Sequence, residues 1–80
     1  MITVHVKLFA TLRSYRPGLK IGEAFPEELP DGATVGQLLK QVGLPEEEVK
    51  MIFVNGIVRD REHTLAEGDE LGIFPPVGGG

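Results

Sequence analysis

One short amphipathic helix is predicted in the chain, and it limits the fold to a small domain of two layers. Residues 34–37 match the capping box, in which Thr34 caps the helix and Gln37 reaches back to the Thr34 amide. Apolar residues then follow at the helical spacing i, i+3, i+4 and i+7: Val35, Leu38, Leu39 and Val42. Gly43 stands where a left-handed C-terminal cap is needed, and Pro45 follows shortly after it. One such stripe can cover one face of a small sheet, which favours an α+β fold.

Segments with a period of two lie on both sides of this helix and predict the strands of that sheet. Residues 2–8 alternate, with the apolar side chains on one face: Ile2, Val4, Val6 and Leu8. A second strand is predicted over residues 19–25, where the period of two resumes at Leu19, Ile21 and Phe25. Pro26 has no N–H, so we expect this strand to lie at a sheet edge or to end there.

The second half of the chain predicts a hairpin and a last strand. Asn55-Gly56 between the apolar runs 51–54 and 57–58 is the strongest short hairpin signal that a sequence offers. A turn at residues 67–69 then leads into a strand over residues 70–74. Short helical turns are expected over residues 9–16 and 45–48, the second with Pro45 at its first position. Periodicity leaves open how the first and last strands are ordered in the sheet.

Composition and charge exclude several classes of function. Eighty residues make one domain, and the absence of cysteine excludes disulfides, thiol catalysis and metal sites with cysteine ligands. A net charge of −4 argues against nucleic acid as a partner, because binding would need a basic patch. No long uncharged apolar run is present, so no membrane partner is expected. The sequence begins without the charged lead and apolar block of a signal peptide, so we expect a cytoplasmic protein.

The end of the sequence, Phe74-Pro75-Pro76-Val77-Gly78-Gly79-Gly80, carries the functional prediction. The proline pair favours an extended backbone, and the glycines that follow make a narrow thread without a single Cβ. The only reactive group on this thread is the terminal carboxylate. We therefore predict a folded domain over residues 1–74 and a flexible tail over residues 75–80 that ends in Gly-Gly. The alternative, a cloning remnant or a merely disordered end, is the minority interpretation because the tail continues in register from the last strand.

Three motifs carry a resemblance to a known family. They are Leu8-Phe9-Ala10-Thr11-Leu12-Arg13 after the first strand, Val54-Asn55-Gly56 in the hairpin and Phe74-Pro75-Pro76-Val77 before the glycines. With these motifs the whole chain resembles the ubiquitin-like, β-grasp sulfur carriers, which include the small subunit of molybdopterin synthase and the thiamine sulfur carrier. The length and the Phe-Pro-Pro-Val segment look closer to the molybdopterin branch. Two departures are Gly78, where that branch usually has Ala or Ser, and residues 14–18, which lack the acidic residue that often follows the arginine.

The resemblance implies a fold and a set of site residues. The fold is a β-grasp domain with a mixed sheet of about five strands packed on one main helix. Its first and last strands are parallel at the centre, and its second strand lies at an edge. Gly80 corresponds to the reactive position of the family and Gly79 to its paired glycine. The partner-binding residues implied are Phe74, Pro75, Pro76, Val77 and Gly78. Because ordering the tail opposes binding, we expect an exposed apolar patch around Phe74 and the sheet to be the docking surface.

The resemblance also implies a reaction and its partners. An E1-like adenylating enzyme would use ATP to convert Gly80 to an acyl adenylate, and a sulfur donor enzyme would supply the sulfur for a thiocarboxylate. The large subunit of molybdopterin synthase would then receive the loaded tail. The chain itself is expected to bind no cofactor and to be no enzyme, because it lacks a cysteine, a serine nucleophile motif and a phosphate-cradling loop. The alternatives are sulfur delivery for thiamine, amino-acid or tungsten-cofactor synthesis, or a β-grasp interaction module or protein modifier.

Several other side chains have ordinary structural interpretations. His5 and His63 are isolated, without a third ligand at a recognisable spacing, so no metal site is expected. Three aromatic residues are most simply core or core-edge residues: Phe9, Phe25 and Phe53. Arg13 stays open between a packing stem, a salt bridge and an interface residue.

Overall fold

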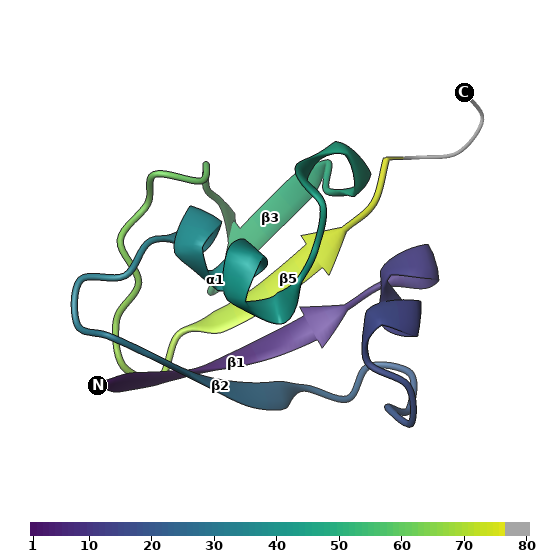
Figure 1. Cartoon of the computed structure of the whole chain (residues 1–80), viewed down its shortest axis with the longest axis horizontal. Helices are drawn as coiled ribbons and strands as arrows, with labels where there is room; N and C mark the ends of the chain where they lie inside the picture. The colour runs from purple at the N-terminus through teal and green to yellow at the C-terminus, as the bar shows by residue number, and fades with distance from the viewer. Residues whose placement is uncertain (77–80) are drawn as a thin grey trace.

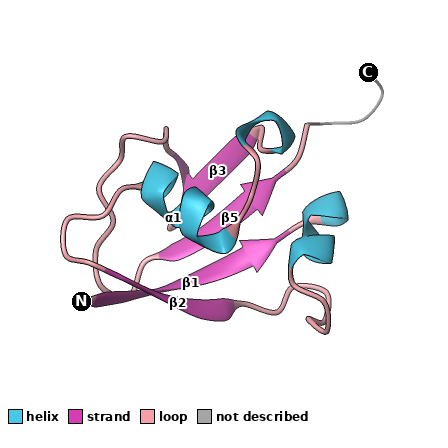
Figure 2. Cartoon of the chain, in the orientation of Figure 1, coloured by secondary structure: helices cyan, strands magenta, loops and turns pink. Residues whose placement is uncertain are grey.

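The computed structural model describes residues 1–76, which form one mixed sheet with a single α-helix across one face (Figure 1; Figure 2). The strands are β1 (Ile2–Leu8), β2 (Phe25–Leu29), β3 (Met51–Val54), β4 (Ile57–Val58) and β5 (Glu70–Phe74). The helix α1 spans Val35–Val42, and two short 3₁₀ helices, η1 and η2, span Ala10–Tyr15 and Glu46–Glu48. The boundary of the predicted tail lies near the end of this range, and residues 77–80 lie outside it. The prediction of a flexible tail therefore stays a prediction.

The sheet has the order β2-β1-β5-β3-β4. β1 and β5 run parallel in the middle of the sheet, with Val6 opposite Leu71 and Leu8 opposite Ile73. The three other pairings, β1 with β2, β3 with β5 and β3 with β4, are antiparallel. The predicted mixed β-grasp sheet, with its first and last strands parallel at the centre and its second strand at an edge, is confirmed.

The core lies between the sheet and α1, as the alternation of the strands requires. Val4 and Val6 of β1 are fully buried, whereas His5 and Lys7, at the alternate positions, are exposed. Leu12 brings η1 into the same core. Within residues 1–76 no polar or charged residue is buried, so apolar packing alone fills the interior. No helix in this described part of the chain is long and apolar enough to cross a membrane.

Both caps of α1 have the predicted geometry. The Thr34 hydroxyl accepts a hydrogen bond from the Gln37 amide at 3.3 Å, and the Gln37 side chain accepts one from the Thr34 amide at 2.8 Å. Gly43 ends the helix in the left-handed region with φ of 88°, and its amide donates to the Leu39 and Lys40 carbonyls. The helix begins and ends where its sequence signals are strongest.

The hairpin and the two 3₁₀ helices also agree with the sequence analysis, with one adjustment. Asn55 and Gly56 both have positive φ, 53° and 83°, which is the geometry of a tight two-residue hairpin turn. Pro45 precedes η2 as its cap residue and is not the first residue of the helix.

The prediction for the second strand was wrong in its position. β2 spans Phe25–Leu29, and the preceding residues form turns in which Ile21 is 85% exposed. Pro26 lies inside β2, opposite His5, where an edge strand tolerates a residue without an N–H. The pattern was hidden by Glu27, which stands between two buried residues on the core side of the strand. Its carboxylate is held there by Arg16 and by Gln41, each at 2.6 Å.

We expect the Thr34→Ala variant to lower the free energy of unfolding by about 1 kcal/mol, because one capping hydrogen bond of α1 is lost. The measurement is the midpoint of urea unfolding at an unchanged slope. Thr34→Ser is the matched control and should restore most of the loss, since serine caps equally well. Equal stability of the alanine and serine variants would contradict this account of the helix start.

The single tyrosine of the chain provides a second prediction, because it links η1 to η2. The Tyr15 hydroxyl donates to Glu48 Oε2 at 2.9 Å. This hydrogen bond, with a smaller effect of burial and of the charges of Glu48 and Glu47, raises the pKa of Tyr15 above its ordinary value of 10.0.

The contribution of this contact to stability is thus present below pH 10 and lost as pH rises through the raised pKa. Titration of phenolate absorbance should give a midpoint above that of free tyrosine. Glu48→Ala should move the midpoint back, whereas an unmoved midpoint would show that the contact does not form in solution.

Candidate functional site

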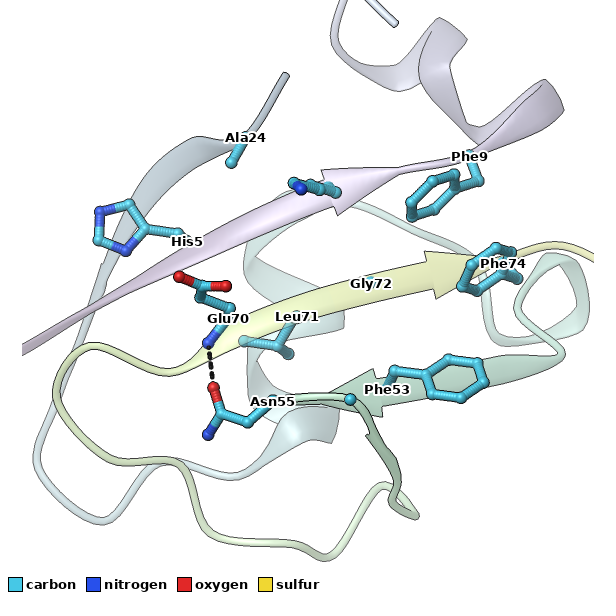
Figure 3. Close-up of a pocket in the computed structure, with 11 residues that line it drawn as sticks. His5, Phe9, Ala24, Phe53, Asn55, Glu70, Leu71, Gly72 and Phe74 are labelled. Atoms are coloured by element: carbon cyan, nitrogen blue, oxygen red, sulfur yellow. Dashed lines mark hydrogen bonds between the residues drawn. The ribbon is translucent and has the colours of Figure 1, made fainter. Parts of the chain in front are cut away.

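The open face of the sheet, on the side away from α1, holds a groove of about 550 Å³ (Figure 3). Its walls are mainly outward-pointing residues of β1, β5 and β3, at the positions that alternate with those that fill the core, together with residues of the adjoining loops. A groove of this size is within the range of ligand and partner sites in proteins. The groove has an aromatic end and a polar end.

Three phenylalanine rings form the aromatic end, at the end of the sheet where β1 and β5 finish and β3 begins (Figure 3). The rings of Phe9 and Phe74 stack with centroids 4.2 Å apart and planes 4° from parallel. Phe53 meets Phe74 edge-on, with centroids 5.4 Å apart and an angle of 74°. All three rings are only half-buried, so they present apolar surface to solvent.

Gly72 of β5 makes this stack possible. A Cβ at this position would lie 3.3 Å from Cε2 of Phe9 and 3.6 Å from Cε1 of Phe74. The missing side chain lets the two rings close over the central strand. Sequence reasoning did not single out this glycine, although its place between Leu71 and Ile73 in the last strand put it on the outer face.

The polar end contains His5, Lys7, Glu70 and Asn55. Asn55 fixes the backbone there through two hydrogen bonds. Its side-chain oxygen accepts from the Glu70 amide at 2.9 Å (Figure 3), and its backbone amide donates to the Glu70 carbonyl at 2.7 Å. Its side-chain nitrogen donates to Asp69 Oδ1 at 2.9 Å. This network holds the hairpin turn against the start of β5.

The root of the predicted tail is attached to the aromatic end. The Phe74 carbonyl accepts a hydrogen bond from the Lys50 amide at 2.8 Å, and the Ile73 carbonyl accepts one from the Phe9 amide at 3.1 Å. Pro75, which is half-buried, and Pro76, which is exposed, follow directly. The remaining predicted site residues, Val77, Gly78, Gly79 and Gly80, lie outside the described residues, so their roles stay predictions.

Two of the three aromatic residues assigned to the core or its edge are on the other face. Phe25 is a core residue at 7% exposure, but Phe9 and Phe53 belong to the groove. Arg13 has a structural contact in which Nη2 donates to the Leu19 carbonyl at 3.3 Å. Within residues 1–76, no group of three or more histidine or acidic side chains is placed to hold a metal ion.

Comparison with known proteins decides the family. A family model described as the ThiS family matches residues 6–80. The chain belongs to the ThiS family. The resemblance to ubiquitin-like sulfur carriers is thereby confirmed at the level of a ThiS-like carrier or modifier family, whose proteins work with E1-like activating enzymes and partner subunits. No match was found among curated proteins.

This ThiS family protein is similar to solved structures of a molybdopterin converting factor subunit and of ubiquitin-like proteins. A protein from Pyrococcus furiosus assigned as molybdopterin converting factor, subunit 1, is 30% identical, with a TM-score of 0.77 and 96% of this chain and 100% of that chain covered. Small archaeal modifier protein 1 from Haloferax volcanii is 25% identical, with a TM-score of 0.75 and the same coverage. A ubiquitin from Caldiarchaeum subterraneum, 17% identical with a TM-score of 0.60 and coverage of 99% and 98%, shares the fold.

We expect the stacked pair of Phe9 and Phe74 to show a coupling energy of about 0.5–1.5 kcal/mol in a double-mutant cycle of the two leucine variants. The measurement is urea unfolding of the four proteins. Phe25→Leu, on the core side of the sheet, is the control and should show almost no coupling to Phe74→Leu. In a Gly72→Val background the coupling of Phe9 to Phe74 should shrink, because the added side chain separates the rings. An unchanged coupling there would contradict the role given to Gly72.

Proposed function

We propose that the protein is a sulfur carrier whose terminal Gly80 carboxylate is adenylated and then converted to a thiocarboxylate. The observation that carries this proposal is the position of Phe74 in both the groove and the tail root. One residue stacks in the aromatic end of the groove, and the next residues begin the Pro-Pro-Val-Gly-Gly-Gly segment. A partner seated on the groove would therefore receive the tail beside its own docking surface.

The proposed reaction needs an activating partner, because a carboxylate is a poor electrophile. In the first step an oxygen of the Gly80 carboxylate attacks the α-phosphorus of ATP, which gives an acyl adenylate and releases pyrophosphate. A persulfide of the sulfur donor enzyme then attacks the acyl carbon and displaces AMP. A thiol cleaves the resulting acyl disulfide by exchange and leaves the thiocarboxylate. Because this chemistry uses ATP, the proposal includes a cytoplasmic location.

Much of the affinity for a partner enzyme must come from the folded domain, because ordering the tail opposes binding. Six residues, 75–80, reach at most about 20 Å when fully extended, enough to enter a buried pocket. Fixing the backbone of the last four costs roughly 4–8 kcal/mol. Contacts between the tail and the partner first have to offset this cost, and only the remainder contributes to the affinity. The exposed aromatic end of the groove supplies the apolar surface that can provide the remaining affinity.

Within this function, the small subunit of molybdopterin synthase is the role we favour. Its support is the 30% identity to the Pyrococcus furiosus protein assigned as molybdopterin converting factor, subunit 1, over its full length. The large subunit of the synthase would then be the second partner, and the chain itself would be the non-catalytic subunit. Sulfur delivery to thiamine, amino-acid or tungsten-cofactor synthesis would use the same tail chemistry.

The first test is the intact mass of the protein after incubation with an E1-like adenylating enzyme from the same organism, ATP and a persulfide donor. We expect the gain that corresponds to one oxygen replaced by sulfur, localised to Gly80. The gain should be absent when ATP is omitted. A variant without Gly79 and Gly80 should show no gain while it unfolds at the same urea concentration as the wild type. No gain with any adenylating enzyme of that organism would contradict the carrier function.

A second candidate, a protein modifier, is favoured by the likeness to small archaeal modifier protein 1. In that case the adenylated Gly80 would pass to a lysine amine and form an amide bond. The two functions differ in what the tail carries at the end. Peptide mapping of the protein isolated from its own cells should show a terminal thiocarboxylate for the carrier and a Gly80–lysine linkage to other proteins for the modifier.

A further inference from the structure

Two neighbouring carboxylates at the polar end of the groove have different surroundings. Both oxygens of Asp69 are used within the fold, since Oδ1 accepts from Asn55 and Oδ2 accepts from the Ala66 amide at 2.8 Å. The adjacent Glu70 has its backbone fixed by Asn55 on both sides. Its carboxylate lines the groove, and no described residue donates a hydrogen bond to it. The fold explains Asp69 and leaves the Glu70 carboxylate without a role.

Glu70 lies on the same strand and the same face of the sheet as Phe74, from which the tail starts. It begins the central strand β5, and Gly72 and Phe74 follow at alternate positions on the same face. The three ion pairs of residues 1–76 join other groups: Met1 with Asp31, Arg16 with Glu27, and Arg61 with Glu46. His5 and Lys7 share the groove with Glu70, but neither forms an ion pair with it among the described residues. An exposed carboxylate on a fixed backbone thus stands at one end of the groove and an apolar surface at the other.

We propose that Glu70 is a specificity-determining residue, which pairs with a cationic side chain of the adenylating enzyme that docks on the groove. The proposal rests on the proposed function, because it takes that enzyme as the occupant. The occupant is a protein, since the apolar surface continues beyond the groove to half-exposed Met51 and Val58, at 42% and 52%, and ends at the tail root. A cation opposite Glu70 would fix the orientation of the partner along β5. The tail would then start at the correct side of the partner surface.

Lys7 provides a second test, because its charge is opposite to that of Glu70. It lies on the adjacent strand and lines the same groove, so it would repel the cation that Glu70 attracts. Neutralising Glu70 should weaken docking and neutralising Lys7 should strengthen it. A groove recognised only through its apolar surface would respond to neither change in this opposed way.

The test measures the dissociation constant of the full-length chain for the adenylating enzyme without ATP, so that no chemistry occurs. We expect Glu70→Gln to raise the constant about threefold and Glu70→Lys about tenfold, as for a solvent-exposed charge pair and its reversal. Lys7→Gln should lower it about twofold. These differences should fade at about 1 M salt, where exposed charges are screened within a few ångströms.

Glu62→Lys is the matched control, because it makes the same charge change at an exposed residue that does not line the groove. At low salt it should change the constant by less than Glu70→Lys does, and at about 1 M salt both effects should be small. Each variant is used only if it unfolds at the urea concentration of the wild type. Equal effects of the two charge reversals at low salt, or a shift in the same direction for Glu70→Gln and Lys7→Gln, would overturn the role of Glu70.

Sulfur loading of the wild type and binding of the Glu70 variants separate the role of Glu70 from the carrier function. A wild-type chain that gains sulfur, together with Glu70 variants that bind like the Glu62 control, overturns only the role of Glu70. A wild-type chain that neither gains sulfur nor binds the adenylating enzyme overturns both.

Discussion

The parallel pairing of β1 with β5 is the constraint on which the rest of the molecule depends. It joins the first strand of the chain to the last one in the middle of the sheet, across more than sixty residues of sequence. The pairing places the residue that follows β1 beside the residue that ends β5, so Phe9 and Phe74 can stack. A hairpin cannot join two parallel strands, so the chain between β1 and β5 must cross over. The helix and the other three strands lie in this connection. The start of the tail is thereby supported by the most interior strands of the fold.

The two faces of the sheet have different tasks, and the division follows from the alternation of side chains. One face packs on α1, and all of its fully buried side chains among the described residues are apolar, with Glu27 of the edge strand partly buried beside them. The other collects a short aromatic cluster and a set of charged groups around a groove. The second face also affects the backbone at Gly72, because a Cβ there would lie in tight contact with the Phe9 ring, 3.3 Å from its Cε2. A strand residue that is weak for sheet formation is here explained by the rings above it.

Local signals predicted much of this fold, and the long-range features needed either the resemblance or the structure. Thr34, Gln37 and Gly43 define the helix because capping depends on neighbours in sequence, and Asn55-Gly56 defines the hairpin for the same reason. β2 was misplaced because Glu27 points inward, and only its contacts with Arg16 and Gln41 make that position acceptable. Phe9 and Phe53 were assigned to the core or its edge because each strand was read alone. The groove becomes visible only when the outward positions of β1, β3 and β5 are placed side by side, which requires their register.

The two outer strands of the sheet have a consequence for how the protein meets other chains. β2 contains Pro26, which cannot donate to a further strand, and β4 has only two residues. Sheets with such borders are poor templates for edge-to-edge addition, the route by which exposed strands nucleate aggregates. A small domain with half-exposed aromatic rings on one face of its sheet is protected in this way along the direction in which β-structure grows most readily. The borders of the sheet thus offer little to a further strand, and the surface that remains open is the face that holds the groove.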